Sequence, residues 1–136
     1  MFLSLSSRGD YGFLIMTMLA ECAVNTYVSV AEIAKAKKVP GAYASQLVSS
    51  LKKARLIESK EGTTGGYRLA RPANEITLKE IIEALEGPIA PVKCLREKDH
   101  HCDKETVCSM KPIWVETTLL VEAQLSNKKL SDLIKK

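Results

Sequence analysis

Residues 41–70, GAYASQLVSSLKKARLIESKEGTTGGYRLA, decide the fold because they join a polar-faced helix to a two-stranded hairpin. The apolar residues of the first part recur at helical spacing over residues 41–54, and they are Ala44, Leu47, Val48 and Leu51. The segments RLIESK and GYRLA are typical of short β-strands, and the glycine-rich EGTTGG between them allows a tight turn. The stretch predicts an amphipathic helix followed by a small β wing.

Two further helices are predicted before this stretch. Apolar residues form one helical stripe from Tyr11 to Cys22, with Leu14, Ile15, Met18 and Leu19 between them. A short second helix begins at SVAE, where Ser29 can cap the helix and Glu32 can return the hydrogen bond. Helix, short helix, turn, helix and hairpin is the order of a winged helix-turn-helix. The predicted fold class is therefore mainly α with a small β wing.

The composition indicates one globular domain with a basic N-terminal half. The chain has 136 residues, 46% of them hydrophobic, and a net charge of +4, so it can bury one core without disulfides. Residues 1–75 hold ten Lys and Arg against six Asp and Glu, whereas residues 76–136 hold ten of each. A basic excess confined to one half suggests contact with a polyanion. Neither a membrane span nor a signal peptide is recognised, and we expect a cytoplasmic protein without membrane contacts.

The polar face of the helix predicted over 41–54 suits DNA recognition. Gln46 can pair bidentately with adenine, and hydroxyl groups can reach base edges or phosphates. Glycines in the hairpin turn would let the backbone approach the minor groove, with cations close by. The candidate DNA-binding residues are Tyr43, Ser45, Gln46, Ser49, Ser50, Lys53, Lys60, Thr63, Thr64, Gly65 and Arg68. A solvated helix face or a protein-interaction module is the alternative.

Beyond the wing the pattern changes twice. ITLKEIIEALEG contains a second capping box, Thr77 with Glu80, and predicts a short helix that ends at a Gly-Pro pair. Residues 88–111 are polar and flanked by prolines, which is typical of a loop organised by something other than apolar burial. A helical stripe resumes at Ile113, with Trp114, Thr117, Leu120, Val121 and Leu125. This helix should need a partner surface, which a second copy of the chain can supply.

Three of the four cysteines and both histidines lie in CLREKDHHCDKETVC, residues 94–108. In a reducing compartment, three cysteines within fifteen residues are more typical of metal binding or redox chemistry than of disulfides. Their spacing is wider than in most zinc knuckles and favours an iron–sulfur cluster, while zinc and redox-active thiols remain open. The proposed ligands are Cys94, Cys102 and Cys108. Cys22 lies on an apolar stripe and is expected to pack in the core.

These patterns divide the chain into three predicted parts. Residues 1–87 form a winged helix-turn-helix DNA-binding domain, residues 88–111 a cysteine-rich cluster-binding loop, and residues 112–136 a long dimerisation helix with a C-terminal segment. The sequence has no phosphate-binding loop and no recognisable pair of nucleophile and base. We therefore expect neither an enzyme nor a small-molecule substrate.

Taken together, the motifs resemble the Rrf-two family of winged-helix transcription regulators. The resemblance covers nearly the whole chain and rests on LSSRGDYG, YASQLVSSLKKARLI, GTTGGYRLA, EITLKEIIEALEGPI and the cysteine loop followed by IW. Within the family, DYGFLIMTMLA and LEGPIAPVKC are most similar to regulators of the SUF iron–sulfur assembly operon. The resemblance implies a homodimer that binds double-stranded operator DNA and carries an iron–sulfur cluster, 2Fe-2S or 4Fe-4S, on the three cysteines.

Two positions depart from the family pattern. IscR-like members place a histidine ligand where this chain has Lys111, whereas NsrR-like members take an acidic ligand from the other subunit, at the position of Asp10. The resemblance favours Asp10 over His100 or His101 as the fourth ligand. Many relatives also have an arginine aimed at the minor groove at the position of Glu61, whose charge opposes phosphate binding.

The expected function is a homodimeric transcription regulator whose operator affinity is controlled by the cluster. It would act as a repressor or redox sensor in iron–sulfur assembly or in a response to redox, nitric oxide or iron stress. A cluster bridging the dimer would change the spacing of the two reading helices when it is gained or lost. The alternative is a zinc-binding or cluster-free winged-helix interaction module.

Overall fold

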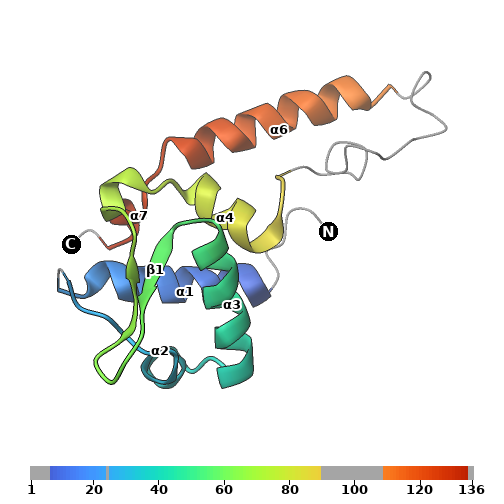
Figure 1. The fold of residues 1–136 in the computed structure, drawn as a ribbon. Helices are drawn as coiled ribbons and strands as arrows, with labels where there is room; N and C mark the ends of the chain where they lie inside the picture. The colour runs from blue at the N-terminus through green and yellow to red at the C-terminus, as the bar shows by residue number, and fades with distance from the viewer. Residues whose placement is uncertain (1–6, 24, 90–108, 135–136) are drawn as a thin grey trace.

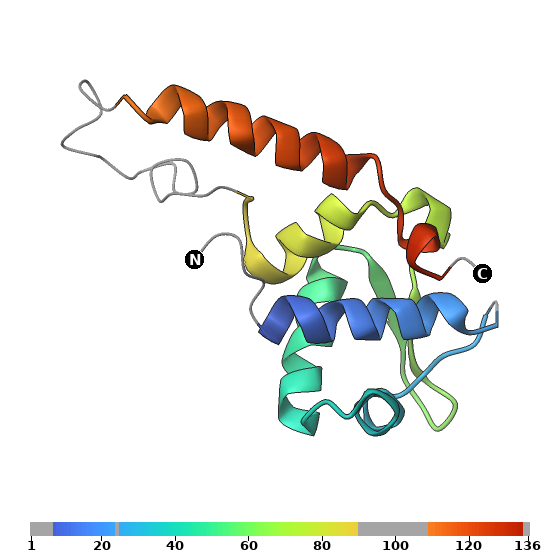
Figure 2. The same cartoon turned by 180° about the vertical axis from the view of Figure 1, so that it is seen from behind.

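The computed structural model describes residues 7–23, 25–89 and 109–134. They form a mainly helical fold with one antiparallel two-stranded sheet, as predicted (Figure 1). The elements are α1 (Ser7–Glu21), α2 (Val30–Lys37), α3 (Gly41–Lys53), β1 (Ile57–Lys60), β2 (Gly66–Leu69), the 3-10 helix η1 (Ala73–Glu75), α4 (Leu78–Glu86), α6 (Lys111–Ser126) and α7 (Leu130–Leu133). Both ribbon views place α4 between α6 and the layer that contains α1 and α3 (Figure 2).

The helix-turn-helix consists of α2 and α3. The capping box predicted for α2 is confirmed, because the Ser29 hydroxyl accepts a hydrogen bond from the Glu32 backbone N–H at 3.1 Å and the Glu32 carboxylate bonds back to Ser29. Lys38 ends α2 in the left-handed region, with φ of 55°. The chain then turns at Pro40, which directly precedes α3. A capped start and a left-handed end keep α2 short, so that α3 can cross it.

The hairpin of β1 and β2, here called the wing, has the predicted strands. Its register pairs Ile57 with Leu69 and Lys60 with Gly66. A separate bridge joins Tyr67 to Val28, which ties the wing to the segment before α2. A Cβ atom at Gly66 would collide with the Val28 backbone, so glycine is required for this close approach.

The core confirms most of the predicted stripe of α1, with one error. Ile15 and Leu19 are buried as predicted, but Leu14 is 40% exposed and Met16 is fully buried instead. The reason is that α1 packs against α2, α3, α4 and α7, so its buried arc is turned from the predicted one. At Gly12 a Cβ atom would overlap the Leu85 side chain, which shows how closely α1 approaches α4.

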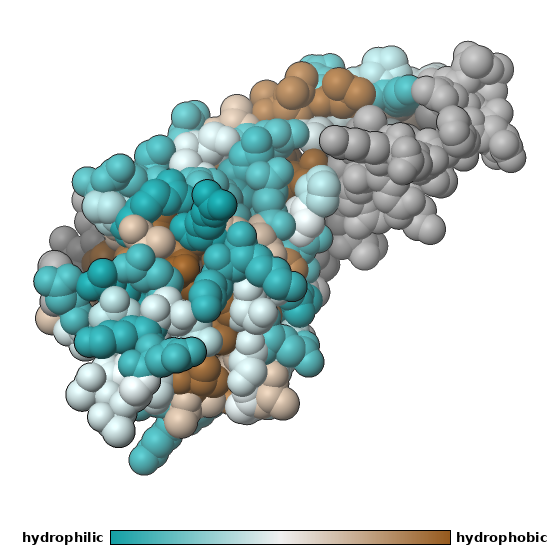
Figure 3. Space-filling view, viewed as in Figure 1, coloured by the Kyte–Doolittle hydropathy of each residue, from teal (hydrophilic) through white to brown (hydrophobic). Residues whose placement is uncertain are grey.

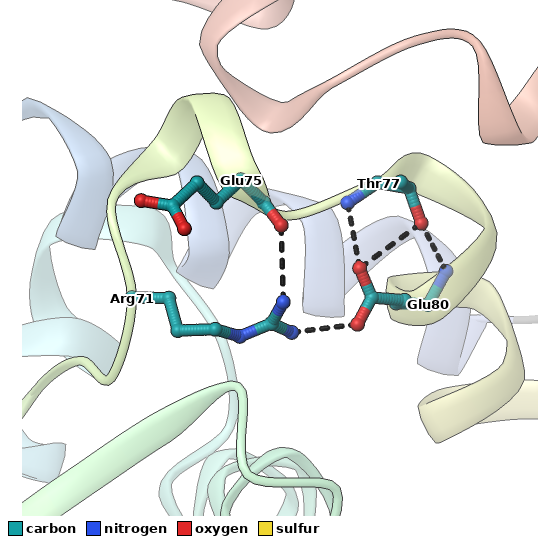
Figure 4. A network of polar contacts seen from close by, with 4 residues as sticks. All are labelled: Arg71, Glu75, Thr77 and Glu80. Atoms are coloured by element: carbon teal, nitrogen blue, oxygen red, sulfur yellow. Dashed lines mark hydrogen bonds and ion pairs between the residues drawn. The ribbon is translucent and has the colours of Figure 1, made fainter.

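Side-chain hydrogen bonds hold the start of α4. At its start, Glu80 closes the predicted capping box with Thr77 and also accepts a hydrogen bond from Arg71 Nη2 at 2.6 Å (Figure 4). Arg71 Nη1 donates to the Glu75 carbonyl oxygen at 3.0 Å. These bonds join the segment that leaves β2 to the first turn of α4.

No residue of α6 is buried among the described residues. One side of α6 lies on α4, where Lys79 Nζ pairs with Glu122 Oε2 at 3.1 Å. The space-filling view shows a hydrophobic surface over α6 (Figure 3). Its most exposed apolar side chains are Ile113, Leu119 and Leu120. The predicted stripe is therefore divided, since Trp114 is half-buried while Leu120 is 67% exposed.

The C-terminal segment returns to the core, which the sequence did not predict. Leu130 of α7 is fully buried, and its backbone N–H donates to the Ile76 carbonyl at 2.8 Å. A bridge between Thr77 and Lys129 holds the same region. The division of the chain at residues 87 and 111 stays a prediction. In the described ranges, no helix is long and apolar enough to cross a bilayer.

Candidate nucleic-acid interface

The outer face of α3 gathers most of the DNA-binding side chains predicted for that helix. Ser45, Gln46 and Ser49 are exposed, and Lys53 continues the same face one turn later; we call these four residues the reading face. The opposite face is buried, and it consists of Ala44, Leu47, Val48 and Leu51. The reading face therefore offers hydrogen-bonding groups for base edges and a cation for phosphate, while core packing holds the helix from behind.

Two predicted DNA contacts on α3 have partners within the protein. The Ser50 hydroxyl accepts a hydrogen bond from Arg8 Nη2 at 2.9 Å and donates to the Gln46 carbonyl oxygen at 3.2 Å. The Tyr43 ring packs edge-on against Tyr11, with ring centres 5.6 Å apart. Both side chains are half-buried. A structural role is therefore visible for each, and their contact with DNA stays a prediction.

The turn of the wing is a compact exposed tip. Its exposed residues are Glu61, Gly62, Thr63 and Thr64, and Lys60 stands beside them at the end of β1. Gly62 has φ of 107°, and its carbonyl oxygen accepts a hydrogen bond from the Gly65 N–H at 3.1 Å. The tip offers two hydroxyl groups and one cation to a sugar–phosphate backbone, whereas the Glu61 carboxylate opposes such contact.

Arg68, another predicted DNA contact, is held at the base of the wing. Its Nε pairs with Glu58 Oε1 at 2.6 Å, its Nη1 donates to Asn25 Oδ1 at 2.7 Å, and its guanidinium lies 4.7 Å from the Tyr27 ring centre. Glu58 is directly opposite Arg68 in the hairpin register, so this pair could have been predicted as a cross-strand pair. Asn25 and Tyr27 were missed because the α1–α2 connection has no periodic pattern. These contacts brace the wing against that connection.

The start of α3 and the tip of the wing lie at the same edge of the molecule, with α2 between them (Figure 1). The first N–H groups of a helix lack intrahelical acceptors and carry a partial positive charge, so they favour phosphate. This edge therefore combines a helix N-terminus with a polar tip. A duplex lying along it would meet both the reading face and the wing.

Of the predicted metal ligands, Asp10 lies within the described residues, and its exposed carboxylate is in the first turn of α1. Cys94, Cys102 and Cys108 lie outside the described residues. Elsewhere in the described part of the chain, no three His, Cys, Asp or Glu side chains are grouped as a metal site would require. The ligand set therefore stays a prediction.

Cys22 behaves as the predicted core thiol. It is half-buried, and its Sγ donates to the Met18 carbonyl oxygen at 3.2 Å. Burial first, and then the charges of Glu21 and Glu32, raise the pKa of this thiol. A thiol that stays protonated is a poor metal ligand and a poor nucleophile.

The fold and this interface define a winged helix-turn-helix protein of the DNA-binding class. Residues 5–136 match the Rrf2 family, described as an iron-dependent transcriptional regulator. The chain is 33% identical over 131 residues to the HTH-type transcriptional regulator CymR of Bacillus subtilis, covering 96% of this chain and 89% of that protein. It is 32% identical over 133 residues to protein rrf2 of Nitratidesulfovibrio vulgaris, covering 98% and 88%. The chain therefore belongs to the Rrf2 family.

Solved structures agree with this assignment. IscR of T. potens superposes with a TM-score of 0.75 at 30% identity, covering 96% of this chain and 85% of that one. CymR of B. subtilis superposes with a TM-score of 0.74 at 34% identity, covering 96% and 95%. The prediction of a transcription regulator rather than an enzyme is confirmed. The SUF subgroup stays a prediction, since both IscR and CymR are similar to this chain.

Proposed function

We propose that the chain acts as a homodimer that binds operator DNA through α3 and the wing, with an affinity set by an iron–sulfur cluster. The observation that carries this proposal is a group of three cysteines, Cys94, Cys102 and Cys108, in one fifteen-residue segment of a winged-helix regulator. The iron dependence in the family description and the similarity to IscR support the same chemistry. Such a regulator would work in the reducing cytoplasm, where the thiols stay available.

The exposed side of α6 supports the homodimer. Leu119 and Leu120 are 61% and 67% exposed. Apolar side chains in such a group favour coverage by another surface, and two copies related by a twofold axis can cover each other. The dimer would then present two reading faces to one operator, which raises affinity and makes half-site spacing important.

The donor set fits iron–sulfur chemistry. Three thiolates are soft ligands that suit iron, and an exposed carboxylate can complete the set from the partner subunit. Asp10 is exposed in the first turn of α1, and Leu14, one turn later, leaves apolar surface on the same side. Lys111 occupies the position of the IscR-like histidine and cannot serve as a ligand. When bound, the cluster would link the two subunits through their ligands, and this link would respond to oxygen, nitric oxide or iron supply.

The chain's own residues perform the recognition. Gln46 would read a base edge, Ser45 and Ser49 would bind base edges or phosphate, and Lys53 would neutralise phosphate. A change in the spacing of two reading faces needs to supply only about 1–3 kcal/mol, or roughly five- to hundredfold in affinity, to switch an operator.

The first test is visible absorption with an iron and acid-labile sulfide assay on protein purified without oxygen. We expect a brown chromophore that bleaches in air and is lost in Cys102→Ser. The matched control is Cys22→Ser, which should keep iron and sulfide because Cys22 packs against α1. Asp10→Ala should keep DNA binding but respond less to air. An identical response in Asp10→Ala and the parent would remove Asp10 from the ligand set.

A cluster-free regulator is the second candidate, favoured by the similarity to the oxidized form of Staphylococcus aureus CymR, at 31% identity and a TM-score of 0.75. In that case the cysteines of residues 94–108 would act as thiols. A colourless protein that cannot be reconstituted with iron and sulfide, but that changes DNA affinity on thiol oxidation, would support this candidate. Stoichiometric zinc without such a change would instead indicate a structural metal.

A further inference from the structure

Arg8 joins three helices through one guanidinium group. It lies in the first turn of α1, its Nε donates to the Leu85 carbonyl oxygen at 2.9 Å, and its Nη2 donates to Ser50 Oγ at 2.9 Å. Leu85 is in the last turn of α4 and Ser50 is in the last turn of α3. The partners are 77 and 42 residues away in sequence, so only tertiary packing brings them together.

The bond to Leu85 fixes the C-terminal end of α4. The last carbonyl groups of a helix have no intrahelical donor and carry a partial negative charge. The Arg8 guanidinium satisfies one of these carbonyls and places a positive charge at that pole. Because Gly12 allows α1 to contact the Leu85 side chain directly, α1 and α4 have little freedom to slide.

The bond to Ser50 connects the same guanidinium group to α3, the helix that carries the reading face. Ser50 is adjacent to Ser49 of the reading face, and its hydroxyl donates to the Gln46 carbonyl oxygen at 3.2 Å. Gln46, one turn earlier, is exposed on the same reading face. The guanidinium therefore sets the end of α3 relative to α4 without taking part in the reading face itself.

We propose that Arg8 is a positioning residue for sequence-specific DNA binding, holding α3 at a fixed place against α1 and α4. The planar fork of arginine can donate to two acceptors on different helices at once, whereas lysine presents a single ammonium group. Loss of the fork lets α3 shift relative to the wing, so base contacts weaken while phosphate contacts that tolerate small shifts remain. This role does not depend on the iron–sulfur cluster.

The experiment compares an operator, selected from random duplexes by the parent protein, with a random-sequence duplex of equal length. Arg8→Gln should bind the operator about five- to thirtyfold more weakly, a factor that corresponds to one or two hydrogen-bonded contacts. Arg8→Lys should lose most of the same affinity despite its charge. Binding to the random duplex, and the slope of affinity against salt, should stay unchanged in both variants. The matched control Lys53→Gln should weaken both duplexes and reduce the salt slope by about one.

A second variant keeps the proposal testable if Arg8→Gln fails to fold. Ser50→Ala removes the acceptor on α3 but leaves the bond to α4, and it should also weaken operator binding selectively. Arg8→Gln combined with Ser50→Ala should bind no more weakly than Arg8→Gln alone, because both changes break one connection. The proposal would be overturned if Arg8→Gln lost the same factor of affinity for the operator and for the random duplex, or if its salt slope were reduced. Unchanged operator affinity in both Ser50→Ala and Arg8→Lys would also overturn it.

Discussion

The helices α3 and α6 have similar lengths but opposite surfaces. The 13-residue α3 buries four apolar side chains and leaves a polar face outside. Among the described residues, the 16-residue α6 has no buried side chain and leaves Leu119 and Leu120 exposed. A helix whose apolar face is covered by its own chain can offer polar groups to DNA. A helix without such cover keeps an apolar face that another surface can bury. The difference supports the proposal that α3 recognises DNA and that α6 forms the dimer.

The largest effect expected from this difference is on stability. Leu47→Ala in α3 should lower the free energy of unfolding by about 2–5 kcal/mol, because it leaves a cavity in a fully packed core. Leu120→Ala should change the stability of dilute protein by about 0.5 kcal/mol or less, since its side chain is exposed. Urea denaturation of both variants measures the contrast. Similar losses would mean that α6 is covered within the single chain.

Dimer formation, in contrast to stability, should depend strongly on the exposed side chains of α6. Leu120→Asp should raise the dimer dissociation constant by about tenfold or more, because a carboxylate replaces an apolar contact at the proposed interface. Sedimentation at a series of concentrations would measure this change. The matched control is Ala31→Asp in α2, an exposed position away from α6. A dimer equally weakened by both changes would point to net charge rather than to the α6 surface.

A smaller effect concerns α4, which packs on both α3 and α6. Burial acts to raise the pKa of Glu80, but hydrogen bonds from Thr77 and Arg71 outweigh it, so the pKa lies below its ordinary value of 4.5. The stability that Glu80 contributes is therefore complete above that value, and it is lost as the pH falls through the lowered folded-state pKa.

The test of this effect is Glu80→Gln, which keeps a hydrogen-bonding side chain but removes the charge. It should lower the free energy of unfolding near pH 7 by about 1 kcal/mol or less, because solvent screens this partly exposed pair. The difference from the parent should shrink towards about pH 3, below the unfolded-state value. Denaturation at both pH values, with Glu116→Gln on α6 as control, measures it. A loss independent of pH would show that the ion pair contributes little.

The smallest expected effect is on DNA affinity, and it tests whether the wing tip faces DNA. Glu61→Gln should strengthen DNA binding by about two- to fivefold at low salt, because an exposed anion at the wing tip repels phosphate. The gain should fade as salt is added. Fluorescence anisotropy at two salt concentrations would show both changes. Glu75→Gln, which removes another exposed carboxylate, from η1, should leave affinity unchanged if the tip faces DNA.

Local patterns predicted the elements of the fold well. The capping boxes at Ser29 and Thr77 set the starts of α2 and α4, and the apolar spacing of α3 identified its buried face. Each of these signals lies within a few residues of chain, so no distant partner is needed to interpret it. The SUF subgroup, the cysteine ligands and the role of Asp10 remain predictions.

Contacts between distant residues account for what the local patterns did not predict. The helical spacing of its stripe predicts a buried Leu14, and this prediction is wrong because the packing of four helices around α1 turns the buried arc towards Met16. Arg68 is bound by Glu58 and by Asn25 of a distant connection, and its contact with DNA stays a prediction. The hairpin register can predict Glu58 as a partner of Arg68, whereas only three-dimensional proximity shows the contact with Asn25.

The sequence by itself determined the order of helices, the hairpin, the polar face of α3, the cysteine trio and the family, because these depend on local spacing and residue type. The tertiary structure alone decided that Arg8 connects α3 to α4, that Leu130 returns to the core, and that α6 lies on α4 with no buried side chain among the described residues. These contacts join residues far apart in the chain. Their energies depend on how the helices pack, which no local pattern encodes.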